Sequence, residues 1–145
     1  MSPRGMGPAE NYPGPFAQAF YPRLWAFFYS LTLRRPVAEA LTNAVLVLVV
    51  SGQVKPLNPQ PVEVFRLATG VMNTVAPAVN PVTHNRLEIA LTRLDDETRL
   101  LMALVFDAEL TYVEAGEVIG ADEAFVASEV IRAVAALNEL LKEAG

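Results

Sequence analysis

The sequence predicts an all-α protein, and three observations support this prediction. Apolar residues recur at three- and four-residue spacing in most segments between the proline-rich stretches, which is the periodicity of one helix face. The β-branched run at residues 45–50 could form a buried strand, but it follows a strongly helix-forming stretch, and no partner strand occurs elsewhere in the sequence. The hydrophobic fraction of 52% favours a packed core over a disordered chain.

Three helices are expected in the first part of the chain. Residues 1–15 contain four prolines and three glycines, so they are predicted to form a flexible arm. A first helix is expected over residues 16–33, and a second begins near Pro36, because proline suits a first helical turn. A third follows over residues 62–75, after a proline-rich loop. Its expected apolar positions are Val62, Phe65, Leu67, Ala68, Val71 and Met72.

A second proline-rich stretch gives the best candidate for a domain boundary. We expect a helical domain over residues 16–76, a linker over 77–84 and a second helical domain over 85–145. The second domain should begin with a short helix near residues 86–92. The next helix is expected to begin at Asp95 or Asp96.

The last two helices, within residues 110–141, are predicted from a turn and an apolar stripe. Gly120, Ala121 and Asp122 should form a tight turn, and Asp122 should cap the last helix, because its carboxylate can accept hydrogen bonds from unpaired backbone N–H groups. Apolar residues at helical spacing should face the core. They are Val126, Val130, Ala133, Val134, Leu137, Leu140 and Leu141.

Charge is distributed unevenly along the chain, which limits the classes of partner. Residues 1–85 hold six Lys and Arg against three Asp and Glu, a net charge of +3. Residues 86–145 hold five against thirteen, a net charge of −8. Because proteins bind phosphate backbones through Lys and Arg, the acidic part should repel nucleic acid over most of its surface.

The sequence has no motif for catalysis, metal binding or membrane insertion. It lacks a phosphate-binding glycine loop, a nucleophile–histidine pair and cysteine, and His84 has no second candidate ligand. The longest apolar run has seven residues, whereas a membrane-spanning helix needs about 20. We therefore expect no enzyme activity, no cofactor and no small-molecule substrate. Because no secretory signal is evident, we expect a cytoplasmic location.

Motifs in both parts of the chain match one family of transcription proteins. Residues 110–120, LTYVEAGEVIG, are similar to that family's "LSYEEIAEILG" in region four. Residues 38–45, AEALTNAV, follow "AEDLVQET", and residues 65–70, FRLATG, follow "WLYRIARN", both in region two. Over roughly residues 16–141 the chain resembles the extracytoplasmic-function class of bacterial sigma-70 factors. The resemblance implies a region-two-like half and a region-four-like half with a helix-turn-helix.

The departures from the family pattern fall on its working surfaces. The resemblance implies that the "AEDLVQET" helix meets RNA polymerase through polar side chains and that the recognition helix is basic. Here both surfaces are nearly uncharged, and Ala127 and Glu129 replace two basic positions. Their outward residues are candidate protein-interface positions. For Phe125 and Ile131, the alternative to a protein interface is that they are scattered apolar residues on the surface. For the stripe at residues 40–48, the alternative is a helix that is buried, either within the monomer or against a second chain. The candidates are Ala40, Asn43, Ala44, Val47, Leu48, Phe125, Ala127 and Ile131.

Three hypotheses about function follow. The leading one is a sigma-factor-like regulator that has lost promoter recognition and acts through contacts with itself, an anti-sigma factor or RNA polymerase. Another is a structural helical dimer with no link to transcription. The runner-up to the leading hypothesis is a working sigma factor that binds DNA. Its candidate contacts are Arg23, Arg34, Arg35, Lys55, Arg66 and Arg132. We favour an ion pair of Arg132 with Glu129 or Glu139 over a phosphate contact.

Overall fold

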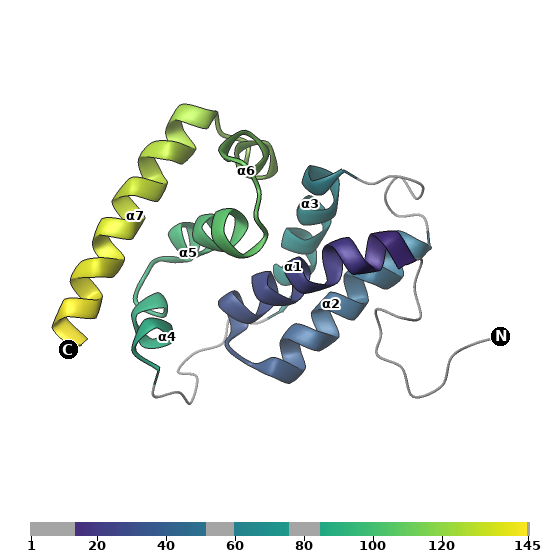
Figure 1. The fold of residues 1–145 in the computed structure, drawn as a ribbon, viewed down its shortest axis with the longest axis horizontal. Coiled ribbons are helices and arrows are strands. Elements are labelled where there is room, and N and C mark those ends of the chain that lie inside the picture. The colour runs from purple at the N-terminus through teal and green to yellow at the C-terminus, as the bar shows by residue number, and fades with distance from the viewer. Residues whose placement is uncertain (1–13, 52–59, 76–84, 145) are drawn as a thin grey trace.

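The computed structural model describes residues 14–51, 60–75 and 85–144, and all regular structure in these ranges is helical (Figure 1). The N-terminal half consists of α1 (Gly14–Thr32), α2 (Arg35–Val50) and α3 (Pro61–Met72). The C-terminal half consists of α4 (Arg86–Leu91), α5 (Asp96–Met102), the π-helical segment η2 (Ala103–Asp107), α6 (Tyr112–Ile119) and α7 (Glu123–Ala144). The all-α prediction is confirmed.

Two details of the sequence prediction change in the structure. The alternative of a strand at residues 45–50 is wrong, because these residues continue α2. The predicted arm and linker fall largely outside the described residues, and residues 14 and 15 already belong to α1. The boundaries of the two domains stay predictions.

An aromatic cluster forms the core of the N-terminal half. Phe27, Phe28 and Phe65 are fully buried. The ring centroids are 5.2 Å apart for Phe27 and Phe28 and 5.5 Å apart for Phe27 and Phe65, and both pairs meet edge to face. This geometry places the positive edge of one ring on the negative face of the other. Val64, which the predicted apolar positions of α3 omit, is also fully buried.

In the C-terminal half, α4, α5, α6 and α7 each begin at a capping side chain. Asn85, Asp95, Thr111 and Asp122 each accept a hydrogen bond from the backbone N–H three residues later, at 3.1, 2.8, 3.1 and 2.8 Å respectively. Such bonds satisfy N–H groups that have no partner within the helix. The predicted cap at Asp122 and the predicted helix start at Asp95 or Asp96 are confirmed.

The turn between α6 and α7 depends on two glycines. Gly120 has a φ of +79°, a conformation that other residues adopt at a cost. The N–H groups of Gly120 and Ala121 donate to the carbonyl of Gly116, at 2.7 and 2.8 Å. A side-chain carbon at Gly116 would collide with the carbonyl oxygen of Ala121. The predicted tight turn is therefore confirmed, and α6 and α7 form a helix-turn-helix pair.

The predicted core stripe of α7 is only partly buried. Val126, Val130 and Ala133 are buried, but Val134 is 36% exposed, so its assignment to the core is wrong. Val134 lies eight residues after Val126, about 80° further around the helix axis, and therefore at the edge of the stripe. The remaining predicted positions are half-buried: Leu137, Leu140 and Leu141.

The two halves pack on one continuous core. α1 contacts η2, and α3 contacts α6. Phe20 and Phe27 of the N-terminal half belong to the same buried cluster as Leu104, Ala108 and Val126 of the C-terminal half. Figure 1 shows α7 at the outer edge of the C-terminal half, away from α2. The relative position of the halves is thus set by direct contact.

Candidate protein-interaction faces

The outward side of α2 is uncharged over its last three turns. Its inner side packs on α1 and α3. We call the outward side the α2 face, and it comprises Ala40, Asn43, Ala44, Val47, Leu48 and Val50. Val47 and Val50 are 51% and 52% exposed, so no element of the described structure covers them. The alternative in which α2 is buried on all sides within the monomer is therefore wrong, and burial against a second chain stays a prediction.

Asn43 holds an unpaired acceptor beneath the α2 face. Its side-chain oxygen Oδ1 is buried and has no hydrogen-bond partner among the described residues, although the residue as a whole is half-buried. Buried polar atoms in proteins are nearly always paired.

A second uncharged surface runs along α7. Ile131 is the most exposed large apolar residue described, at 70%. We call this surface the α7 face, and it comprises Ala124, Ala127, Ile131, Val134, Ala135 and Asn138. All six positions lie within about 60° of Ile131 around the helix axis. Phe125 is 51% exposed but lies about 120° from Ile131, so the structure does not place it on the same face.

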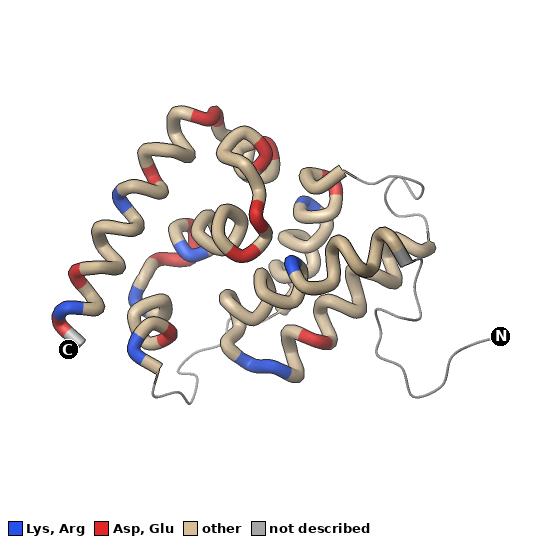
Figure 2. The backbone as a smooth tube through the Cα atoms, in the orientation of Figure 1, with Lys and Arg blue, Asp and Glu red and all other residues tan. Residues whose placement is uncertain are grey.

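The two basic residues of α7 each pair with a carboxylate of the same helix. Arg132 donates to the carboxylate of Glu129, and Lys142 donates to Glu139 at 3.4 Å. The hydrogen bond that Arg132 donates to Glu129, together with the negative charge of that carboxylate, raises the pKa of Arg132. The expected pairing of Arg132 is confirmed, which leaves the helix without an unpaired basic side chain among its described residues. Figure 2 shows acidic positions distributed over α5, α6 and both ends of α7.

The structure disperses the basic residues expected to contact DNA. Arg34 and Arg35 are exposed together at the start of α2, and Lys55 lies outside the described residues. Arg23 donates from Nε to the carbonyl of Ala108 at 2.7 Å, and Arg66 donates from Nη2 to the carbonyl of Glu117 at 2.9 Å. Arg23 belongs to α1, Arg35 to α2 and Arg66 to α3, and Figure 2 shows the basic positions of these helices apart from one another.

Sequence reasoning missed the structural role of Arg23. Its guanidinium lies 5.1 Å from the ring centroid of Phe20 and 5.7 Å from that of Phe65. A cation above an aromatic face is attracted by the negative charge of the ring. Phe20, three residues before Arg23 on the same helix, is the sequence signal that could have indicated this contact.

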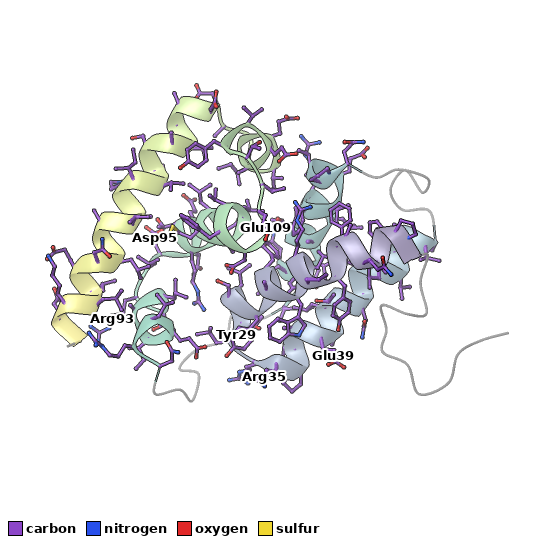
Figure 3. All side chains as sticks on the ribbon, in the orientation of Figure 1. Tyr29, Arg35, Glu39, Arg93, Asp95 and Glu109 are labelled. Atoms are coloured by element: carbon purple, nitrogen blue, oxygen red, sulfur yellow. The ribbon has the colours of Figure 1, made fainter. Side chains whose placement is uncertain are left out.

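A polar contact joins α1 to α4. The hydroxyl of Tyr29 donates to Oε2 of Glu88 at 2.9 Å, and this hydrogen bond, together with burial, raises the pKa of Tyr29. Arg35 opposes that shift, and Figure 3 shows Tyr29, Arg35 and Glu39 at the end of the molecule where α1 meets α2. The Tyr29–Glu88 bond is thus a polar contact between the two halves.

Two further features bear on what the described residues can do. They contain no group of three or more His, Cys, Asp or Glu that could hold a metal ion. In the same ranges, no helix has the length and apolar character needed to cross a bilayer. The α2 face and the α7 face are candidate interaction faces because of their exposed apolar residues, Val47, Val50, Ile131 and Val134.

No family model and no curated protein sequence matches the chain. Among solved structures, the fold is similar to the sigma factor RpoE from Bartonella quintana in complex with the anti-sigma factor NepR, with a TM-score of 0.69 and 20% identity over 88% of this chain and 95% of that one. It is also similar to CnrH in complex with the cytosolic domain of CnrY, with a TM-score of 0.68 and 18% identity over 90% and 85%. The expected sigma-factor-like fold is confirmed over both halves.

Proposed function

We propose that this protein is a sigma-factor-like transcription regulator that acts through protein contacts and does not recognise promoters. The observation that carries the proposal is the combination of this fold with uncharged outward faces on α2 and α7. A recognition helix needs cationic side chains for phosphates and donors for base edges. On α7 both basic residues, Arg132 and Lys142, are already paired with carboxylates.

A protein partner fits the exposed faces better than nucleic acid does. The α2 and α7 faces offer Val47, Val50, Ile131 and Val134 to solvent, and exposed apolar groups are stabilised by burial in an interface. Both similar structures were solved with a protein bound, an anti-sigma factor in one and the cytosolic domain of CnrY in the other. By analogy, this chain would bind an anti-sigma factor in the cytoplasm, as a decoy that leaves the working sigma factor free.

Affinity purification from the host with the tagged full-length chain tests this proposal. We expect an anti-sigma factor or RNA polymerase to be recovered and identified by mass spectrometry. Val47→Lys and Ile131→Lys should each weaken binding of the purified partner at least about tenfold, as expected for central apolar contacts. Leu87→Lys, at a 46% exposed apolar position on α4, is the matched control and should bind normally.

The remaining outcomes separate the alternatives. Recovery of no transcription protein, together with a dimer in sedimentation, would favour a structural helical dimer and contradict the proposal. Equal binding by Val47→Lys, Ile131→Lys and the wild type would also contradict it, because the two faces would then play no part.

A further inference from the structure

Three arginines form hydrogen bonds that cross between the two halves. Arg23 of α1 reaches the carbonyl of Ala108 at 2.7 Å, and Arg66 of α3 reaches the carbonyl of Glu117 at 2.9 Å. In the opposite direction, Arg99 of α5 donates from Nη2 to the carbonyl of Ser30 at 3.1 Å. Donor and acceptor are 85, 51 and 69 residues apart in the sequence, so each bond depends on the tertiary structure.

The three acceptors share a position at the end of a helix. Ala108 is the C-cap of η2, Glu117 lies in the last turn of α6, and Ser30 lies in the last turn of α1. The last four carbonyls of a helix have no partner within it and carry the negative end of the helix dipole. A guanidinium is therefore well matched to these oxygens, and a bond with a charged donor is stronger than one between neutral groups.

The surroundings hold two of these arginines in place. Arg23 lies over the rings of Phe20 and Phe65, at 5.1 and 5.7 Å from their centroids. Arg99 is half-buried, and burial lowers its pKa, although its Nε finds no partner among the described residues. The third, Arg66, is exposed.

Apolar contact alone would not fix the angle between the halves. Burial of apolar surface is non-directional, so the shared core favours contact between the halves without itself selecting one orientation of polar groups. A planar guanidinium bonded to a fixed carbonyl is directional. Three such bonds, at η2, α6 and the end of α1, restrict rotation as well as translation, and the hydrogen bond from Tyr29 to Glu88 adds a fourth, uncharged-donor contact between α1 and α4.

We propose that Arg23, Arg66 and Arg99 act as a clasp that locks the two halves in one relative arrangement. Arg23 and Arg66 were expected to contact DNA. In the clasp they instead bond one half of the chain to the other. The free chain then presents the α2 and α7 faces as one rigid body, which lowers the ordering cost of binding. The clasp concerns the free chain, so it stands or falls independently of the proposed function.

Distance measurement by double electron–electron resonance tests the clasp directly. The chain has no cysteine, so Glu39→Cys on α2 and Ala136→Cys on α7 would carry the only spin labels. The full-length labelled protein should give one narrow distance distribution. With Arg23→Met, Arg66→Met and Arg99→Met together, the distribution should broaden while circular dichroism stays unchanged, because methionine keeps an unbranched stem and removes the donors. Each lost bond should raise the population of displaced distances about tenfold.

A matched control removes the same charge elsewhere. Arg34→Met, Arg86→Met and Arg93→Met together should leave the distribution narrow. Arg86 is a close match, because it also donates to a carbonyl near a helix end, Leu141 at 2.7 Å, but within the C-terminal half.

Two results would overturn the clasp. One is a broad distribution in the wild type, and the other is an unchanged narrow one in the triple clasp variant. If the triple variant does not fold, Arg66→Met decides, because Arg66 is exposed and its loss leaves the core intact. An unchanged distribution in Arg66→Met would contradict the proposal.

Discussion

The two halves of the molecule obtain their structure in different ways. The N-terminal half buries large aromatic rings, and the N-cap of its α2, Arg34, makes no side-chain capping bond. The C-terminal half buries mostly aliphatic and small side chains and defines its helices by capping side chains and by two glycines at one turn. The first half therefore depends mainly on the volume of its core, with one capping box at the start of α3, where the N–H of Gln60 donates to Glu63. The second half depends more on local backbone geometry. Both nevertheless leave one uncharged helix face exposed.

The largest effect should come from the aromatic core. Phe65→Ala removes a fully buried ring that contacts Phe20 and Phe27, and should lower the free energy of unfolding by about 3–5 kcal/mol. Phe106→Ala, at a 55% exposed ring in the C-terminal half, should cost less than about 1 kcal/mol. Urea denaturation followed by circular dichroism measures both. If Phe65→Ala and Phe106→Ala lowered the free energy of unfolding equally, the contrast between the halves would be removed.

The next effect should come from the helix-turn-helix. Gly116→Ala forces a methyl group against the carbonyl of Ala121 and should cost about 1–3 kcal/mol. Gly70→Ala is the matched control in α3, where an added carbon meets nothing within 4 Å. It should stabilise the protein by about 0.5–1 kcal/mol, because alanine favours a helix interior over glycine. Thermal unfolding measures whether Gly116→Ala lowers the stability and Gly70→Ala raises it. If both substitutions lowered it, this account of the turn would be refuted.

A smaller effect is expected at the start of α6. Thr111 accepts a hydrogen bond from the N–H of Glu114 at 3.1 Å, and the Glu114 side chain accepts one from the N–H of Thr111 at 2.9 Å. Thr111→Ala should therefore lower the free energy of unfolding by about 1 kcal/mol. Arg34→Ala, at an N-cap without a side-chain cap bond, should have almost no effect. A loss at Arg34 as large as at Thr111 would contradict the difference between the halves.

The smallest effect concerns pH at the boundary between the halves. Burial raises the pKa of Asp107, and a hydrogen bond with Ser30 partly opposes this. The folded state therefore binds the proton more tightly, and the resulting stability is present below the unfolded pKa and lost as pH rises through the folded pKa. Compared with the wild type, Asp107→Asn should lose this fall in stability between acidic and neutral pH. Denaturation across that pH range measures the difference, and parallel curves would refute the assignment.

Helix positions were largely predictable from the sequence, because periodicity, prolines and capping residues act locally. The 120–122 turn and the Asp122 cap followed from residue types alone. Burial at the margin of a helix was less predictable, as Val64 and Val134 show, because it depends on which neighbour the helix meets. The hydrogen bonds of Arg23 and Arg66 to backbone carbonyls of the other half were not predictable, because the acceptors lie 85 and 51 residues away in the sequence.

The candidate faces were predicted in part. The uncharged stripe of α2 and the exposure of Ile131 followed from helical spacing, and the structure leaves both open to solvent. Phe125 and Ile131 both lie outside the apolar core stripe predicted for α7, and both are exposed, but a separation of six residues places them on different sides of the helix. Whether these faces bind a partner stays a prediction.

Reconstituted transcription tests the central claim most directly. The full-length chain would be mixed with core RNA polymerase from the host and a pool of the host's promoter fragments at low salt. The proposed function predicts no promoter-directed transcript beyond that of the core enzyme alone. Promoter-directed transcripts that require the chain, and that disappear with Arg34→Ala and Arg35→Ala, would contradict it and identify a working sigma factor.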